Sequence, residues 1–96
     1  MSLRSAPAAV EAALPDGGSV TVWVGVPDDP YVGNQETNVD LQLREGASVL
    51  ASVTTVLDVD QEHEAHELAR EVQAALESGE ASLSASSIEQ YADRLR

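Results

Sequence analysis

The sequence contains no cysteine, lysine or phenylalanine, and aromatic residues make up only 3% of its 96 residues. Without cysteine there is no disulfide framework, no thiolate zinc site and no thiol nucleophile. No apolar run approaches the roughly 20 residues that a membrane-spanning helix needs, and the N-terminus has no apolar core of the signal-peptide kind. We therefore expect a soluble cytoplasmic protein with no membrane partner.

Acidic residues dominate the charge, with 17 Asp and Glu against 5 Arg and a net charge of -12. Nucleic acids and anionic membranes are bound through basic residues that neutralise phosphates, so we expect neither partner. Molar salt shortens the Debye length to about 3 Å, which screens the self-repulsion of such an acidic surface. The composition resembles that of small uncharacterised haloarchaeal proteins. This resemblance covers the whole chain, implies a halophilic host and assigns no functional residue; an acidic protein of a GC-rich bacterium is the alternative.

The length predicts one domain over residues 1–96, with residues 1–4 outside the fold as a disordered or added leader. Hydrophobic residues make up 43% of the chain, but most are Ala, Val and Leu. Small side chains bury little area per residue, so a second subunit would be a natural source of further stability.

Three segments are predicted to be helical. Residues 5–14 are rich in alanine, and Pro7 suits the first turn of a helix. Residues 61–77 have apolar side chains at helical spacing and are followed by Gly79, a favourable C-cap. Residues 87–96 begin within a capping-box sequence. The apolar stripe of the long helix comprises Ala65, Leu68, Ala69, Val72, Ala75 and Leu76.

Three further segments, 20–26, 37–43 and 47–57, alternate apolar and polar residues and predict strands. The side-chain phase favours a three-residue loop over 44–46, because a two-residue turn would set Leu41 against the less apolar face of the third strand. That loop pairs Leu43 with Ala47, Leu41 with Val49, and Val39 with Ala51. The predicted fold is α+β, a two-layer domain with a three-stranded antiparallel sheet and the element order α-β-β-β-α-α.

A candidate metal site lies on the long predicted helix. His63, His66 and Glu67 are three and four residues apart and share one face of the helix. The segment is similar to the zincin pattern H-E-x-x-H but is one residue shorter, so Glu64 would not stand where that family has its base. No distant third ligand is evident. The alternatives are a solvated helix flank and a pH-sensitive contact.

Trp23 is the most suggestive single residue. It is out of phase with the valines of its strand, so it is expected on the sheet face opposite the core. Gly25 on the same side is expected to leave open space beside it, and Leu50 and Val56 are expected to point the same way. An aromatic residue with aliphatic neighbours on a polar face is a candidate contact surface. A terminal helix of the same chain covering it, and a ligand platform, are the alternatives.

The sequence contains no recognisable catalytic or cofactor motif, so we expect a non-enzymatic protein-interaction module that forms a homodimer or binds another protein. A metal-binding protein is the second interpretation. A degenerate nucleic-acid module is the third, because the expected helix–strand–strand–strand–helix order is similar to that of the double-stranded-RNA-binding domain. That family's basic cluster is replaced here by residues 61–64, Gln-Glu-His-Glu.

Overall fold

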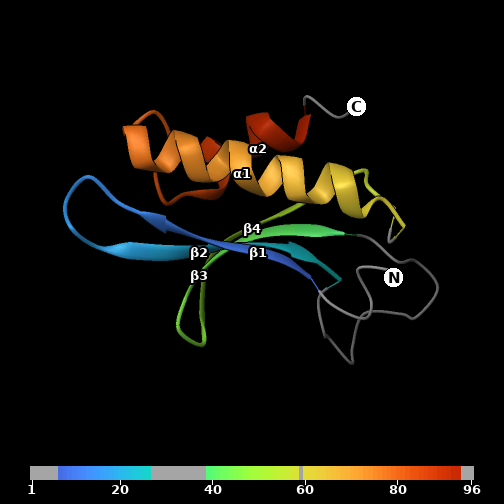
Figure 1. The fold of residues 1–96 in the computed structure, drawn as a ribbon, viewed down its shortest axis with the longest axis horizontal. Helices are drawn as coiled ribbons and strands as arrows, with labels where there is room; N and C mark the ends of the chain where they lie inside the picture. Colours follow the sequence, from blue (N-terminus) through green and yellow to red (C-terminus); the bar gives the residue numbers. More distant parts are fainter. Residues whose placement is uncertain (1–6, 27–38, 59, 94–96) are drawn as a thin grey trace.

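The computed structural model describes residues 7–26, 39–58 and 60–93. These residues form an α+β domain of two layers, in which both helices lie on one face of a four-stranded antiparallel sheet (Figure 1). The strands are hydrogen-bonded in the order β1-β2-β3-β4. The elements are β1 Ala8–Ala13, β2 Ser19–Gly25, β3 Asp40–Glu45, β4 Ser48–Thr54, α1 Glu62–Ser78 and α2 Ala85–Asp93.

The predicted N-terminal helix is wrong, because its residues form β1 at the edge of the sheet. Ala8, Val10 and Ala12 face the helices, and each pairs across to a valine of β2. The segment after β1 closes a hairpin to β2 in which the Leu14 N–H donates to Gly18 O at 2.7 Å. The expected order α-β-β-β-α-α is therefore replaced by β-β-β-β-α-α, and the similarity to the double-stranded-RNA-binding domain is lost.

The core lies between the sheet and the helices. Val20, Val22 and Val24 are buried on the helix-facing side of β2, as their alternation predicts. The predicted stripe of α1 is also confirmed, since all six of its residues are buried. Gly79 ends α1 with a φ of 84°, and its N–H donates to Leu76 O. Among the described residues, no helix is long and apolar enough to cross a membrane.

The loop predicted between β3 and β4 is wrong, although Leu41, Leu43 and Ala51 lie on the core face as predicted. Glu45 pairs with Ser48, so the turn holds only Gly46 and Ala47. A β-bulge in β4 then returns its apolar residues to the core face. Arg44 pairs with Val49 but Leu43 pairs with Ala51, which leaves Leu50 as the extra residue. Leu41 and Leu43 therefore face the core opposite Val53 and Ala51, and Val49 leaves the core face that it was expected to share.

The second helix begins earlier than its capping-box sequence predicts. It starts at Ala85, and the Ser87 N–H donates to Ser84 Oγ at 3.3 Å, so Ser84 acts as the N-cap. Ile88, Tyr91 and Ala92 are its buried residues. Residues 94–96 and residues 1–4 lie outside the described part of the chain.

Candidate interaction surface

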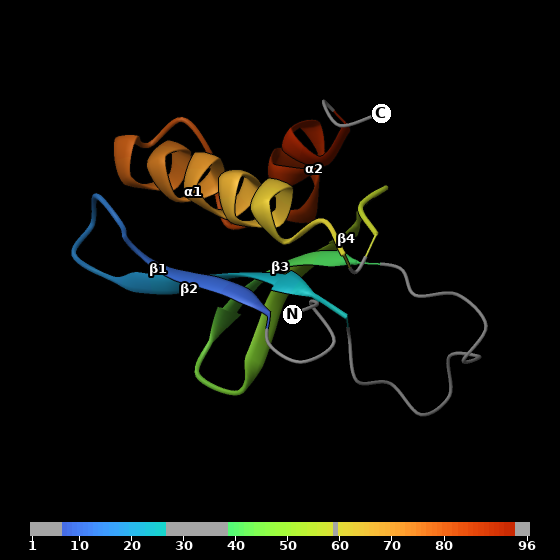
Figure 2. The ribbon, with the colours of Figure 1, turned by 45° about the vertical axis from the view of Figure 1, so that its right-hand side comes forward.

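The sheet face opposite the helices carries the clearest cluster of unusual side chains. Figure 1 and Figure 2 show α1 and α2 on the same side of the sheet, so no described helix covers the other face, which we call the open face. The cross-strand register brings together on it the following central residues: Thr21, Trp23, Asp40, Gln42, Arg44, Val49, Ser52 and Thr54.

Trp23 lies on the open face as predicted, and its neighbour on β3 fixes it there. The Arg44 guanidinium carbon lies 4.0 Å from the centre of the Trp23 ring, in cation–π geometry. Arg44 is held in turn by its Nε, which donates to Gln42 Oε1 at 2.8 Å. Gln42 is buried and pairs directly with Trp23. The result is a preorganised aromatic and cationic patch that remains partly open to solvent.

The open space expected beside Trp23 is filled. A Cβ added at Gly25 would lie 2.8 Å from Pro7 Cβ and 3.0 Å from Trp23 Cζ2. The contact with Pro7 would force a displacement and the contact with the indole ring would be tight, so glycine suits position 25 because Pro7 and the tip of the Trp23 ring both lie close to its backbone. Sequence reasoning placed Trp23 correctly but missed both Arg44 and this close approach.

Asp40 lies at one end of the open face. Burial raises the pKa of its carboxyl above the ordinary value of 3.8, and hydrogen bonds from the Thr54 and Gln42 side chains oppose that rise. Gln42 therefore connects the acidic end of the open face to the Trp23–Arg44 patch through hydrogen bonds with both charged side chains.

Exposed aliphatic side chains gather on β4 and just after it. The exposed fractions are 51% for Val49, 40% for Leu50 and 49% for Val56. Leu83, 38% exposed, is the other large exposed hydrophobic side chain among the described residues, and it lies between α1 and α2. Val49 pairs with Arg44 and therefore lies next to the Trp23–Arg44 patch. Leu50 follows it in the bulge, and Val56 comes just after the end of β4. Sequence reasoning missed Val49 because the bulge reverses its direction.

The predicted metal ligands lie on the first half of α1. His63 Nε2 is 2.7 Å from Glu67 Oε1, and both side chains are largely exposed. His66 lines the same hollow of about 340 Å³, together with Arg70, whose positive charge opposes cation binding. The described residues contain no group of three or more His, Asp or Glu placed to hold a metal ion. The site stays a prediction, and calorimetric titration with Zn²⁺ is its test, since absence of binding heat would reject it.

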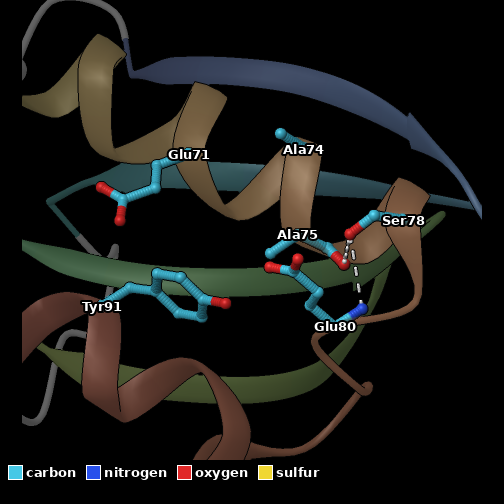
Figure 3. A pocket seen from close by; sticks show the side chains of 6 residues that line it. All are labelled: Glu71, Ala74, Ala75, Ser78, Glu80 and Tyr91. Atoms are coloured by element: carbon cyan, nitrogen blue, oxygen red, sulfur yellow. Dashed lines mark hydrogen bonds between the residues drawn. The ribbon is translucent and has the colours of Figure 1, made fainter.

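A second hollow of about 370 Å³ lies between the two helices (Figure 3). Two of its polar groups are engaged locally: the Ser78 hydroxyl donates to Ala75 O, and the Glu80 N–H donates to Ser78 Oγ. Glu71 and Tyr91 also have interactions of their own. The hollow therefore shows no converging set of groups that would indicate a ligand.

The described residues thus define a small α+β domain with one helix-covered sheet face and one open face. Comparison with protein-family models, with curated proteins and with solved structures finds no match for this chain. Its function has to be argued from its own surfaces.

Proposed function

We propose that this chain is a non-enzymatic protein-interaction module that self-associates, in the cytoplasm of a salt-adapted cell. The observation that carries the proposal is the open face, where Trp23 is held beneath Arg44 beside the exposed side chains of β4. Aromatic and arginine side chains are the residue types most often responsible for binding energy at protein interfaces.

The organisation of the patch supports binding rather than packing within the domain. The Gln42–Arg44 hydrogen bond and the close approach to Gly25 restrict Trp23 before any partner arrives. A side chain that is already ordered loses less conformational entropy on association, so more of its contact energy appears as affinity. Apolar neighbours on β4 extend the same surface toward the edge of the sheet.

Light scattering coupled to size-exclusion chromatography in molar KCl, over a series of protein concentrations, tests self-association. We expect a concentration-dependent dimer, and Trp23→Ala should raise its Kd at least tenfold, which corresponds to about 1.4 kcal/mol. Leu83→Ala is the control, because Leu83 is exposed in the connection between α1 and α2, and both helices lie on the other side of the sheet (Figure 1).

Circular dichroism establishes that each variant is folded. A monomer at every concentration would reject self-association. A dimer that is unaffected by Trp23→Ala would remove the open face from the interface.

A further inference from the structure

The two edges of the sheet are treated differently. At β1, α1 closes the outer edge with side chains: Gln73 Nε2 donates to Glu11 O at 2.8 Å, and the Ala13 N–H donates to Glu77 Oε2 at 3.1 Å. Both β1 groups belong to the edge that faces away from β2, because Ala8, Val10 and Ala12 alternate with them. Another strand could pair there only by displacing these hydrogen bonds.

The outer edge of β4 has no such cover among the described residues. The Thr55 N–H donates to Val39 O at 2.8 Å, which directs the backbone of Thr55 toward the β3 side. Strand alternation then turns the backbone groups of Ser52 and Thr54 outward. Within the described part of the chain, no hydrogen bond reaches these outward groups.

Apart from the bulge at Leu50, β4 lacks the usual protection of a sheet edge. Natural edge strands carry charged residues or proline that discourage pairing with another chain. The segment from Gly46 to Leu57 contains neither, although the chain as a whole has a net charge of -12. Three exposed aliphatic residues, Val49, Leu50 and Val56, lie within it instead. An edge of this kind is a template for strand addition.

We propose that β4 pairs antiparallel with β4 of a second copy of this chain, so that the two sheets join into one. This inference rests on the proposed self-association and assigns it a contact distinct from the open face: β2 is two strands from β4, so a dimer joined only at β4 should not respond to Trp23→Ala. Two copies with the same large negative charge repel each other least where each lacks charge, and this segment is the longest charge-free run in the sequence.

A strand paired antiparallel with its own copy also satisfies the geometry of a two-fold dimer. Each copy presents the same surface to the other, so an uncharged edge meets an uncharged edge and the exposed Leu50 and Val56 side chains of both copies approach one another. The closed β1 edge limits growth, since a dimer joined through β4 has only β1 edges left.

Two variants test the pairing in the full chain. Ser52→Pro removes an outward N–H that has no partner within the described residues, and proline is tolerated on an edge strand where its N–H would face solvent. Leu50→Glu sets two like charges near the two-fold axis. Leu83→Glu is its matched control, because the exposed fractions of the two leucines are 40% and 38%.

We expect Ser52→Pro and Leu50→Glu to be folded by circular dichroism and to dimerise at least tenfold more weakly in molar KCl, with the control unchanged. A wild-type dimer that survives both substitutions would overturn β4 pairing and leave self-association through the open face standing. A wild-type protein that is monomeric at every concentration would reject self-association itself, and β4 pairing between copies with it.

Hydrogen exchange of the wild-type protein decides the question if Ser52→Pro fails to fold. The Ser52 and Thr54 amides should be protected at concentrations where the dimer forms and should exchange freely after dilution. Free exchange of both amides in the dimer would overturn the proposal.

Discussion

At the scale of single residues, Trp23 matters because its neighbours restrict it. Trp23 alternates with the valines of its strand, so the sequence alone places its side chain on the sheet face opposite the core. Its contact with Arg44 depends on the pairing of β2 with β3, in which Thr21 is opposite Arg44 and Trp23 is opposite Gln42. That register joins segments separated by a long connection, so strand pattern alone could not supply it.

Asp40 gives the open face a pH dependence. Its pKa is raised, chiefly by burial, above the ordinary 3.8. Below about pH 3.8 its favourable contribution to folding is fully present, and it is lost as the pH rises through the folded-state pKa, because the folded protein must then hold a partly desolvated carboxylate. Asp40→Asn removes this loss, so we expect urea unfolding to show a gain in stability relative to wild type that is larger at pH 7 than at pH 3.

Glu45→Gln is the comparison for that measurement, because Glu45 is in the same strand but exposed. Its difference from wild type should change much less between the two pH values. If Asp40→Asn and Glu45→Gln have the same pH profile, burial of Asp40 does not govern the effect.

At the scale of elements, the N-terminal segment shows where sequence pattern fails. Its alanines favour a helix locally, and Pro7 suits a helix start. Two of these alanines, Ala8 and Ala12, are small enough to lie buried beneath α1 while β1 supplies hydrogen bonds to β2, whose other neighbour is β3. Pairing of this segment with β2 outweighs the helix propensity of its alanines, which amounts to a few tenths of a kcal/mol per residue.

The β3–β4 hairpin shows a subtler failure. The alternation of apolar and polar residues correctly predicted that Leu41 and Leu43 share a face with Ala51. It wrongly predicted that a three-residue loop brings the apolar residues of the two strands to that face. The protein instead uses a short turn and a bulge at Leu50. Both solutions keep Leu41, Leu43 and Ala51 on the core face. They differ at Val49, whose apolar side chain made the three-residue loop the better match to the hydrophobic pattern. Only the bulge exposes Val49, and with it the full apolar surface of β4.

The two hydrogen bonds by which α1 covers the outer edge of β1 can be tested by mutation. Gln73→Ala with Glu77→Ala removes both side chains that bind the outer edge of β1. We expect the free energy of unfolding to fall by about 1 kcal/mol, a typical net value for such exposed hydrogen bonds. We also expect light scattering to show assemblies larger than a dimer, because both sheet edges are then free to pair.

His66→Ala is the control for that experiment, since His66 is exposed on the same helix but makes no hydrogen bond to β1 among the described residues. It should leave the assembly state unchanged. A double variant that loses stability without forming larger assemblies would show that the two hydrogen bonds hold α1 on the sheet but do not guard its edge.

At the scale of the whole molecule, charge is distributed unevenly. The net charge of -12 is carried by 17 acidic residues, yet the segment Gly46–Leu57 has none. Dispersed acidic charge makes copies of the chain repel one another, and the proposed pairing of β4 places the uncharged segments where that repulsion is least. Stability and association should therefore both depend on how strongly salt screens the acidic surface.

Raising KCl from about 0.1 M to about 1 M shortens the Debye length from roughly 10 Å to roughly 3 Å. We expect the Tm at pH 7 to rise by at least about 5 °C, which corresponds to about 1 kcal/mol for a domain of this size. The Kd of the proposed dimer should fall over the same range, because repulsion between two acidic copies is screened. Differential scanning calorimetry and light scattering measure the two effects.

The same series near pH 4 separates screening from other actions of salt. The isoelectric point is about 4.1, so the net charge there is close to zero and little self-repulsion remains to be screened. The increase in Tm should then be much smaller than at pH 7. An equal increase at both pH values would mean that salt acts through burial of apolar surface, which salts can also strengthen, and the acidic surface would no longer indicate adaptation to a saline cytoplasm.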